Sequence, residues 1–117
     1  MVAPEQRILE IGCGVGNLLS ALQPTRGVGI DFSFEMIKRA RIAHPELEFI
    51  EADGHDLGVL NEYFDVIILS DLINDLWDVQ NVFEQLSRLC HPKTRIIINS
   101  YSRVWELPLA IAAKLGL

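Results

Sequence analysis

The stretch Arg7-Ile8-Leu9-Glu10-Ile11-Gly12-Cys13-Gly14-Val15-Gly16-Asn17 decides the fold of this chain. Its first five residues are mostly apolar and predict a strand over Arg7 to Ile11. The loop from Gly12 to Gly16 has glycine at every second position, where missing side chains permit a sharp turn and let a ligand touch the backbone. Asn17 to Gln23 predicts a helix, stopped by Pro24, whose free amide groups point at the same loop.

Strand and helix patterns alternate along the rest of the chain. Further strands are predicted over Gly27 to Asp31, Leu47 to Glu51, Phe64 to Ser70 and Thr94 to Asn99. The run from Phe64 to Ser70 is almost continuously apolar, which is typical of a strand covered on both faces. Because strands that alternate with helices through short loops pair in parallel with right-handed crossovers, the pattern predicts an α/β fold.

Two more helices are expected between these strands. Ser33 is placed to cap the first, which ends at His44-Pro45 because proline disfavours helical geometry at the residue before it. In the second helix six residues share one face: Val79, Val82, Phe83, Leu86, Leu89 and Cys90. We expect His91-Pro92 to stop that helix.

The chemically distinctive residues follow the ends of the predicted strands. Glu10 and the glycine loop come at the end of the first strand, and Asp31 ends the second. Asp53 follows the third strand, and Ser70-Asp71 lies at the end of the fourth. Parallel α/β sheets bind ligands at the carboxyl ends of their strands, so this placement predicts one binding site along that edge.

Two kinds of nucleotide ligand fit a glycine-rich strand–loop–helix unit. The nicotinamide fingerprint G-x-G-x-x-G, when it is read from Gly12, needs a third glycine at position 17, which is Asn17. When it is read from Gly14, it needs one at position 19, which is Leu19. Glu10 beside the loop would repel a pyrophosphate, whereas it suits a ligand that bears an ammonium and a sulfonium. A tight turn without any ligand is the remaining alternative for this loop.

The two acids Asp31 and Asp53 each have a binding and a structural interpretation. Asp31 lies 31 − 12 = 19 residues after Gly12, where an acid can accept hydrogen bonds from both ribose hydroxyls. Its structural alternative is an acid near the N-terminus of the next helix. Asp53 can hold an adenine amine, but Asp53-Gly54 is also a common turn pair, and taken alone the turn is favoured.

The ordered set of Glu10, the glycine loop, Asp31, Asp53 and the Phe64–Ser70 run resembles the successive motifs of class I S-adenosylmethionine-dependent methyltransferases. The resemblance covers residues 7 to about 100. It implies a Rossmann-like, doubly wound and mainly parallel sheet with strand order 3-2-1-4-5, and S-adenosylmethionine as cofactor.

The resemblance also implies how the cofactor is held. The glycine loop and Glu10 would surround its methionine part, Asp31 would bind the ribose and Asp53 the adenine amine. The backbone at Ser70 and Asp71 would lie near the methionine ammonium and the transferable methyl. The implied cofactor-binding residues are Glu10, Gly12, Cys13, Gly14, Gly16, Asp31, Phe32, Asp53, Gly54, Ser70 and Asp71.

The sequence after the fourth strand argues against one class of methyl acceptor, the nucleobase amino groups, and does not identify the acceptor itself. Family members that methylate nucleobase amino groups often carry an Asn/Asp-Pro-Pro-aromatic run after the fourth strand, whereas this chain has Ser70-Asp71-Leu72-Ile73-Asn74-Asp75. A small-molecule oxygen, carbon or non-nucleobase nitrogen acceptor is therefore expected. Candidates to face it are Asp71, Asn74, Asp75, Tyr101, Ser102, Arg103 and Trp105, all of which equally suit surface positions. No residue stands out as a catalytic base.

Composition narrows the class of protein further. The net charge of −6 and pI near 4.9 argue against direct nucleic-acid binding. The cysteines Cys13 and Cys90 have no metal-ligand spacing and indicate reduced thiols in a cytoplasmic protein. The histidines His44, His55 and His91 are scattered, and no metal site is expected. The apolar stretches are too short to span a bilayer.

The family's sheet usually ends with two more strands that form a hairpin after the fifth. This chain ends at Leu117, with an apolar tail from Glu106 that is compatible with a helix. We therefore expect residues 1–117 to be the cofactor-binding core of a longer chain, without the C-terminal β-hairpin and prone to self-association through an uncovered edge strand. Two alternatives to an active enzyme remain: a non-catalytic cofactor-binding module of a larger assembly, and an NAD-dependent oxidoreductase.

Overall fold

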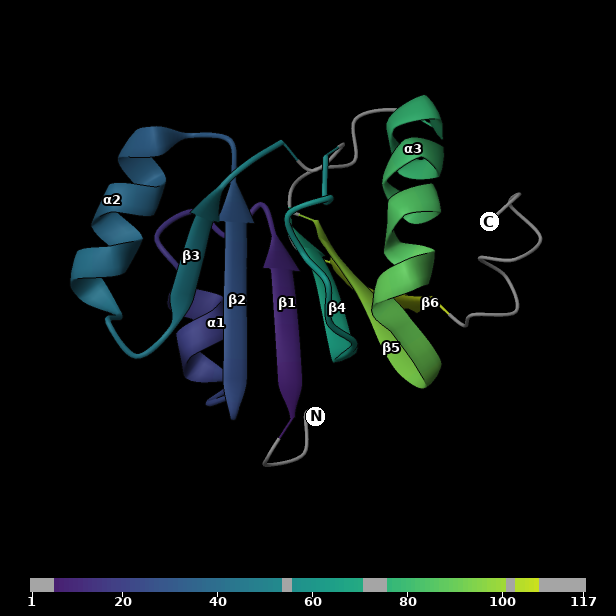
Figure 1. Ribbon diagram of the computed structural model, residues 1–117, viewed down its shortest axis with the longest axis horizontal. Helices are drawn as coiled ribbons and strands as arrows, with labels where there is room; N and C mark the ends of the chain where they lie inside the picture. Colours follow the sequence, from purple (N-terminus) through teal and green to yellow (C-terminus); the bar gives the residue numbers. More distant parts are fainter. Residues whose placement is uncertain (1–5, 54–55, 71–75, 101–102, 108–117) are drawn as a thin grey trace.

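The computed structural model describes residues 6–53, 56–70, 76–100 and 103–107 of the chain, which form a six-stranded sheet with helices on both faces (Figure 1). The strands are β1 (Arg7–Ile11), β2 (Arg26–Asp31), β3 (Glu48–Glu51), β4 (Phe64–Ser70), β5 (Cys90–Ser100) and β6 (Arg103–Leu107). The helices are α1 (Asn17–Ala21), α2 (Phe34–Ala43) and α3 (Leu76–Leu86), and a short 3-10 helix spans Ser87–Leu89.

The sheet order is β3-β2-β1-β4-β5-β6, and the first five strands in this order are parallel. The predicted order 3-2-1-4-5 and the doubly wound architecture are confirmed. β1 lies in the middle of these five strands, paired with β2 on one side and β4 on the other. The glycine loop that follows β1 therefore leaves the sheet near its centre, where the strand order reverses.

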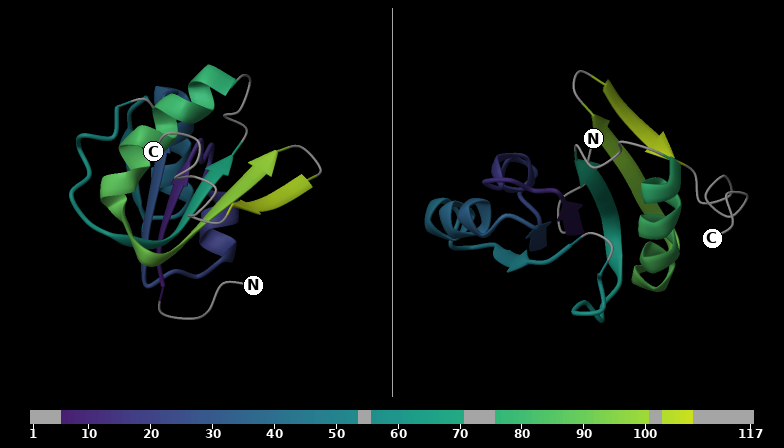
Figure 2. Two further views of the ribbon diagram at one scale, coloured as in Figure 1. Left: turned by 90° about the vertical axis from the view of Figure 1, so that its right-hand side faces the viewer. Right: turned by 90° about the horizontal axis from the view of Figure 1, so that it is seen from above.

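Two hydrophobic clusters lie on opposite faces of the sheet. The first cluster includes Leu9, Ile11, Val28, Ile30, Ile67 and Leu69 of the strands and Val82, Phe83 and Leu86 of α3. The second cluster includes Ile8, Val66 and Ile68 of the strands, Leu19 of α1, Ile37 and Ala40 of α2, and Phe49. Neighbouring residues of a strand point to opposite faces, so α1 and α2 cover one face and α3 the other (Figure 2).

The predicted helix before β5 ends earlier than expected. The helix α3 stops at Leu86, and Cys90 is the first residue of β5 rather than the last residue of a helical face. His91 and Pro92 also belong to this strand. The pairing register shifts between Phe64 and Val66, so β5 has extra residues opposite this point, and an irregular strand can accept a proline that donates no hydrogen bond.

The edge of β5 is covered, which corrects the expectation of an uncovered edge. β6 pairs antiparallel with it, from Ser100 opposite Arg103 to Ile96 opposite Leu107. The sequence predicted no strand after Thr94 to Asn99 and began an apolar, helix-compatible tail at Glu106, whereas Glu106 and Leu107 belong to β6. Val104 and Trp105 are of the β-branched and aromatic types that favour strands. Within the described ranges, no helix has the length and apolar character needed to cross a membrane.

Candidate functional site

The carboxyl ends of the parallel strands lie at the upper edge of the sheet in Figure 1. Glu10, Asp31 and Ser70 lie in the last two positions of β1, β2 and β4. The glycine loop follows β1, and Asp53 comes two residues after β3. The topology thus brings the sequence-predicted residues to one edge, because neighbouring parallel strands end on the same side.

The glycine loop turns sharply because three of its residues adopt positive φ. Gly12, Gly14 and Gly16 have φ of 81°, 56° and 83°, a conformation that strains other residues. The amides of Gly12 and Cys13 both donate to the carbonyl of Ile30, at 2.7 and 3.0 Å. These bonds fasten the loop to β2, so its backbone is held in place without a ligand.

The glycines at 14 and 16 serve different purposes. A Cβ built on Gly14 would meet no atom of the described residues within 4 Å, so this position faces open space among them. A Cβ on Gly16 would lie 2.6 Å from the Phe49 ring and 3.3 Å from His44. Gly14 therefore leaves room above the loop, whereas Gly16 lets β3 and the end of α2 pack against the start of α1.

Cys13 lies between the glycines and is buried. Burial, followed by the charges of Glu10 and Asp31, raises the pKa of the Cys13 thiol to about 12. The side chain is therefore an uncharged thiol at neutral pH. It is a small packing residue of the loop, which contacts the second hydrophobic cluster, rather than a nucleophile.

Glu10 and Ser70 join the ends of β1 and β4. The Ser70 hydroxyl donates to Oε2 of Glu10 at 2.6 Å. Both residues are buried, with 2% and 6% of their surface exposed. A buried carboxylate oriented in this way holds negative charge beside the glycine loop, which favours a cationic group of a ligand.

Asp31 connects the glycine loop to α2. Its Oδ2 accepts from the amide of Gly14 and its Oδ1 from the amide of Ser33, both at 2.9 Å. Ser33 in turn caps α2, as predicted, by accepting from the Met36 amide at 3.3 Å. Asp31 thus contacts both the glycine loop and the N-terminus of α2. Each of its carboxylate oxygens keeps a further lone pair that can accept a hydrogen bond from a ligand.

Asp53 is exposed and follows the end of β3 by two residues. The amide of Ala52 donates to the Asp31 carbonyl at 3.0 Å, and the amide of Asp56 donates to the Asp53 carbonyl at 2.8 Å. Phe32, the residue after Asp31, leaves 76% of its surface exposed at the same edge. Both side chains are therefore accessible to a ligand that extends from the glycine loop.

Several predicted residues cannot be placed in this arrangement. Outside the described residues lie Gly54, His55, Asp71, Asn74, Asp75, Tyr101 and Ser102. Arg103 and Trp105 belong to β6.

Sequence analysis missed how closely Phe49 packs under the loop. A Cβ on Gly29 would lie 2.7 Å from the Phe49 ring and 2.9 Å from the Cys13 sulfur. The signal was present in Gly27-Val28-Gly29, because glycines two apart in a strand share a face and permit close approach. His44 was also passed over: its Nε2 lies 3.1 Å from Oδ1 of Asn17, and so joins the end of α2 to the first residue of α1.

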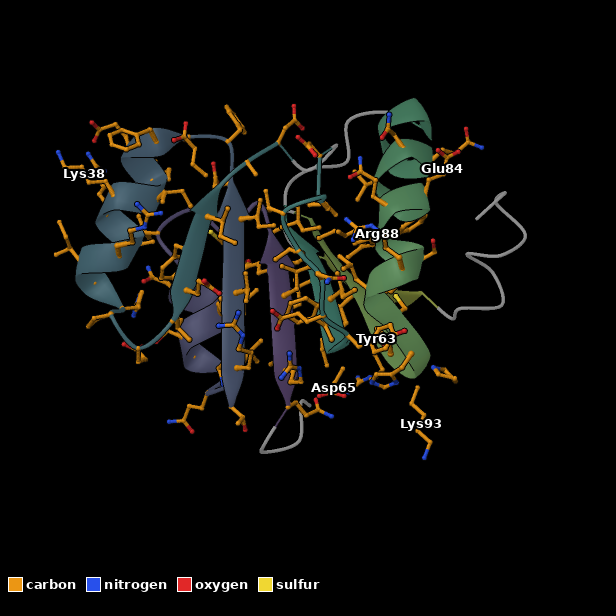
Figure 3. The ribbon with its side chains drawn as sticks, in the orientation of Figure 1. Lys38, Tyr63, Asp65, Glu84, Arg88 and Lys93 are labelled. Atoms are coloured by element: carbon orange, nitrogen blue, oxygen red, sulfur yellow. The ribbon has the colours of Figure 1, made fainter. Side chains whose placement is uncertain are left out.

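The opposite edge of the sheet carries a separate set of charges. Arg26 pairs with Glu62 and Glu48, and Arg7 pairs with Glu62 at 2.6 Å. The Arg26 guanidinium lowers the pKa of Glu62. Figure 3 places Asp65 at this lower edge, where it lies 2.8 Å from His91. No three His, Cys, Asp or Glu side chains of the described residues gather into a metal-binding group.

The sequence matches the model of one protein family, described as a methyltransferase domain, over residues 9–98. The chain belongs to this family. Methyltransferase domains of solved structure share its fold. A S-adenosylmethionine-dependent methyltransferase from Mesorhizobium loti superposes with a TM-score of 0.71 and 25% identity, over 81% of this chain and 46% of that one. Another from Clostridium acetobutylicum superposes with a TM-score of 0.70 and 23% identity, over 84% and 43%.

Curated relatives are also methyltransferases. Phosphatidylethanolamine N-methyltransferase of Cereibacter sphaeroides is 30% identical over 115 residues, which span 92% of this chain and 57% of the relative. Demethylmenaquinone methyltransferase of Streptomyces griseus subsp. griseus is 29% identical over 105 residues, which span 86% and 44%. The methyltransferase domain thus spans about half the length of these relatives.

The residues of this methyltransferase domain fit the family's cofactor, S-adenosylmethionine. The open space at Gly14 leaves the loop backbone accessible. The carboxylate of Asp31 lies beside that space, since it accepts from the Gly14 amide. A cationic, hydroxyl-bearing ligand suits this combination of bare backbone and carboxylates better than a pyrophosphate does.

Proposed function

We propose that this methyltransferase domain binds S-adenosylmethionine at the carboxyl edge of its sheet and directs the methyl group to a small-molecule oxygen, carbon or non-nucleobase nitrogen. The observation that carries the proposal is the open backbone at Gly14, flanked by the Asp31 carboxylate. The positive φ at position 14 favours glycine, and the missing side chain leaves the loop backbone open to a ligand on the side of the Asp31 carboxylate.

Each part of the cofactor has a group to meet it under this proposal. Glu10, held by Ser70, and the loop from Gly12 to Gly16 receive the methionine part, whose ammonium and sulfonium are positive. Asp31 receives the ribose hydroxyls on its remaining lone pairs. Phe32 offers an exposed ring to the adenine face, and Asp53, followed by Gly54, receives the adenine amine. The backbone of Ser70, at the end of β4, is assigned to the reacting end of the cofactor, as is Asp71, which lies outside the described residues.

S-adenosylmethionine, when bound, supplies an electrophilic methyl group on a positive sulfur. The chain's own residues bind and orient. Glu10 and the glycine loop hold the positive end, and Asp31 and Asp53 hold the nucleoside, so that rotation about the long axis of the ligand is restricted. Transfer then requires an acceptor atom about 3 Å from the methyl carbon, in line with the sulfur, and a site from which water is excluded.

The relatives support a small-molecule acceptor. By their names, two act on phosphatidylethanolamine and demethylmenaquinone, and a third, from Zea mays, is a phosphoethanolamine N-methyltransferase 29% identical over 107 residues. We extend to this chain only what these have in common, an acceptor that is neither nucleic acid nor protein. Amines of the ethanolamine type and quinol ring carbons are the first acceptors to test.

Calorimetric titration with S-adenosylmethionine, S-adenosylhomocysteine and NAD, side by side, tests the cofactor assignment. Both sulfur ligands should bind and NAD should not. Binding of NAD alone would overturn the proposal. Turnover of methyl-labelled S-adenosylmethionine against a panel of amine, hydroxyl and carbon acceptors, with a nucleobase set for comparison, then tests the acceptor class.

A further inference from the structure

Two side chains from the α3 side of the molecule hold the connection between β3 and β4. Oε1 of Gln85 accepts from the amide of Leu57 at 2.5 Å. The Arg88 guanidinium donates through Nη1 to the carbonyl of Leu60 at 2.8 Å and through Nη2 to the carbonyl of Leu57. Leu57 and Leu60 are buried in the first hydrophobic cluster, so the segment is fastened by packing as well as by hydrogen bonds.

Arg88 binds both ends of one backbone turn, from Leu57 to Leu60. The amide of Leu60 donates to the carbonyl of Leu57 at 3.0 Å, which closes the turn between them. One planar guanidinium then donates to the carbonyls of the first and the last residue of this turn. Lysine, which presents a compact point charge on a flexible stem, does not reproduce this fork.

The turn from Leu57 to Leu60, which Gln85 and Arg88 clamp, is linked to Asp53 by backbone hydrogen bonds. On one side of Asp53, the Ala52 amide is bonded to the Asp31 carbonyl of β2. On the other side, the Asp56 amide is bonded to the Asp53 carbonyl, and Leu57, held by Gln85 and Arg88, follows directly. The backbone is therefore fixed on both sides of Asp53. The bond to β2 fixes it before Asp53, and Gln85 of α3 and Arg88 of the 3-10 helix fix it after Asp53.

We propose that Arg88 and Gln85 are positioning residues for adenine recognition: by clamping the turn from Leu57 to Leu60 they set where the Asp53 carboxylate lies. This rests on the proposed function, in which Asp53 receives the adenine amine. An adenine amine donates to a carboxylate, whereas a 6-oxo purine presents an oxygen that the carboxylate repels. The clamp should therefore determine selectivity between the two bases more than overall binding.

The test measures the binding of S-adenosylhomocysteine and its 6-oxo counterpart, S-inosylhomocysteine, by calorimetry. The wild-type chain should prefer the adenine ligand by about tenfold or more, as expected for a hydrogen bond to a charged group. In Arg88→Met and in Gln85→Met the preference should fall below about threefold, so that the two ligands differ by less than about 0.7 kcal/mol. Gln85→Glu keeps an acceptor for the Leu57 amide and should keep the preference.

Arg7→Met is the matched control. Nε of Arg7 donates to the carbonyl of Tyr63 at 3.0 Å, so it too holds the β3–β4 connection by a backbone carbonyl, but at the opposite edge. Figure 3 shows Arg88 beside α3, well apart from Tyr63 and Asp65 at that edge. Arg7→Met should lose thermal stability and keep the adenine preference.

An unchanged preference in folded Arg88→Met and Gln85→Met would overturn the inference, as would an equal loss in Arg7→Met. If Arg88→Met does not fold by circular dichroism, Gln85→Met alone decides. A wild-type chain that binds S-adenosylhomocysteine without preferring adenine would refute the role of Asp53, and the inference with it. A wild-type chain that binds neither ligand would instead refute the proposed function.

Discussion

Asp31→Ala separates the two interpretations of this acid, as a ribose ligand and as an internal anchor. In the structure, the carboxylate accepts two backbone amides, from Gly14 and Ser33, both at 2.9 Å. Alanine removes both acceptors. Because the group is only partly buried, water can replace it, and we expect a loss of about 1 kcal/mol of unfolding free energy for each bond.

The effect on cofactor binding should be larger than the effect on stability explains. Each hydrogen bond from a ribose hydroxyl to the carboxylate contributes about 1.5–3 kcal/mol to the binding free energy. Each 1.4 kcal/mol is a factor of ten in affinity. Asp31→Ala should therefore weaken S-adenosylmethionine binding at least tenfold, and by about a hundredfold or more if both bonds form. Calorimetry at a temperature where the variant is fully folded measures this.

Asp65→Ala is the matched control for this prediction. Asp65 also accepts two hydrogen bonds, from the Arg7 amide and from Nε2 of His91, both at 2.8 Å, but at the opposite edge of the sheet. Its loss should lower the melting temperature to a similar extent and leave the affinity unchanged. If Asp31→Ala binds the cofactor as tightly as Asp65→Ala does, Asp31 is only an internal anchor and the ribose assignment is wrong.

The remaining predictions concern the glycines, the buried thiol and acid stability. Gly14→Val should abolish S-adenosylmethionine binding while the chain keeps its helix content, because φ of 56° and open space limit the damage to local strain and a blocked backbone; wild-type affinity would show that the cofactor does not approach this loop. Gly16→Ala should instead lower the melting temperature more than Gly14→Ala does, since its Cβ would lie 2.6 Å from the Phe49 ring, and equal melting temperatures would contradict this. Cys13, with a pKa of about 12, should resist iodoacetamide at pH 8 in the native chain and react once guanidinium unfolds it; mass spectrometry that finds rapid native labelling would refute its burial as a neutral thiol. The Arg7 amide and His91 lower the pKa of Asp65, so its contribution to stability is present above its unfolded pKa and is lost as the pH falls through the folded pKa. Asp65→Asn should accordingly flatten the fall in melting temperature below about pH 4, and an unchanged acid profile would count against the pair.

The sequence alone determined the parallel α/β core and the edge at which the candidate site lies. Alternating apolar runs and helical patterns are local features, and Ser33 and Pro45 mark helix ends through their own backbone chemistry. The strand ends then follow from the pattern, because parallel strands all end at one edge. That is why Glu10, Asp31 and Asp53 could be assigned to one edge before any contact was known.

The tertiary structure decided what the chain's periodicity cannot encode. The sixth strand depends on pairing with β5, and Cys90 belongs to β5 because Phe64 pairs with it across the sheet. Gly14 and Gly16 look alike in sequence, yet only contact with Phe49, 33 residues away from Gly16, distinguishes the packing glycine from the open one. Likewise the hydrogen bonds of Arg88 to Leu60 and Leu57, in the turn before β4, join residues that are 28 and 31 positions apart in the sequence. Such contacts between distant residues arise only when the sheet has formed, so no local pattern predicts them.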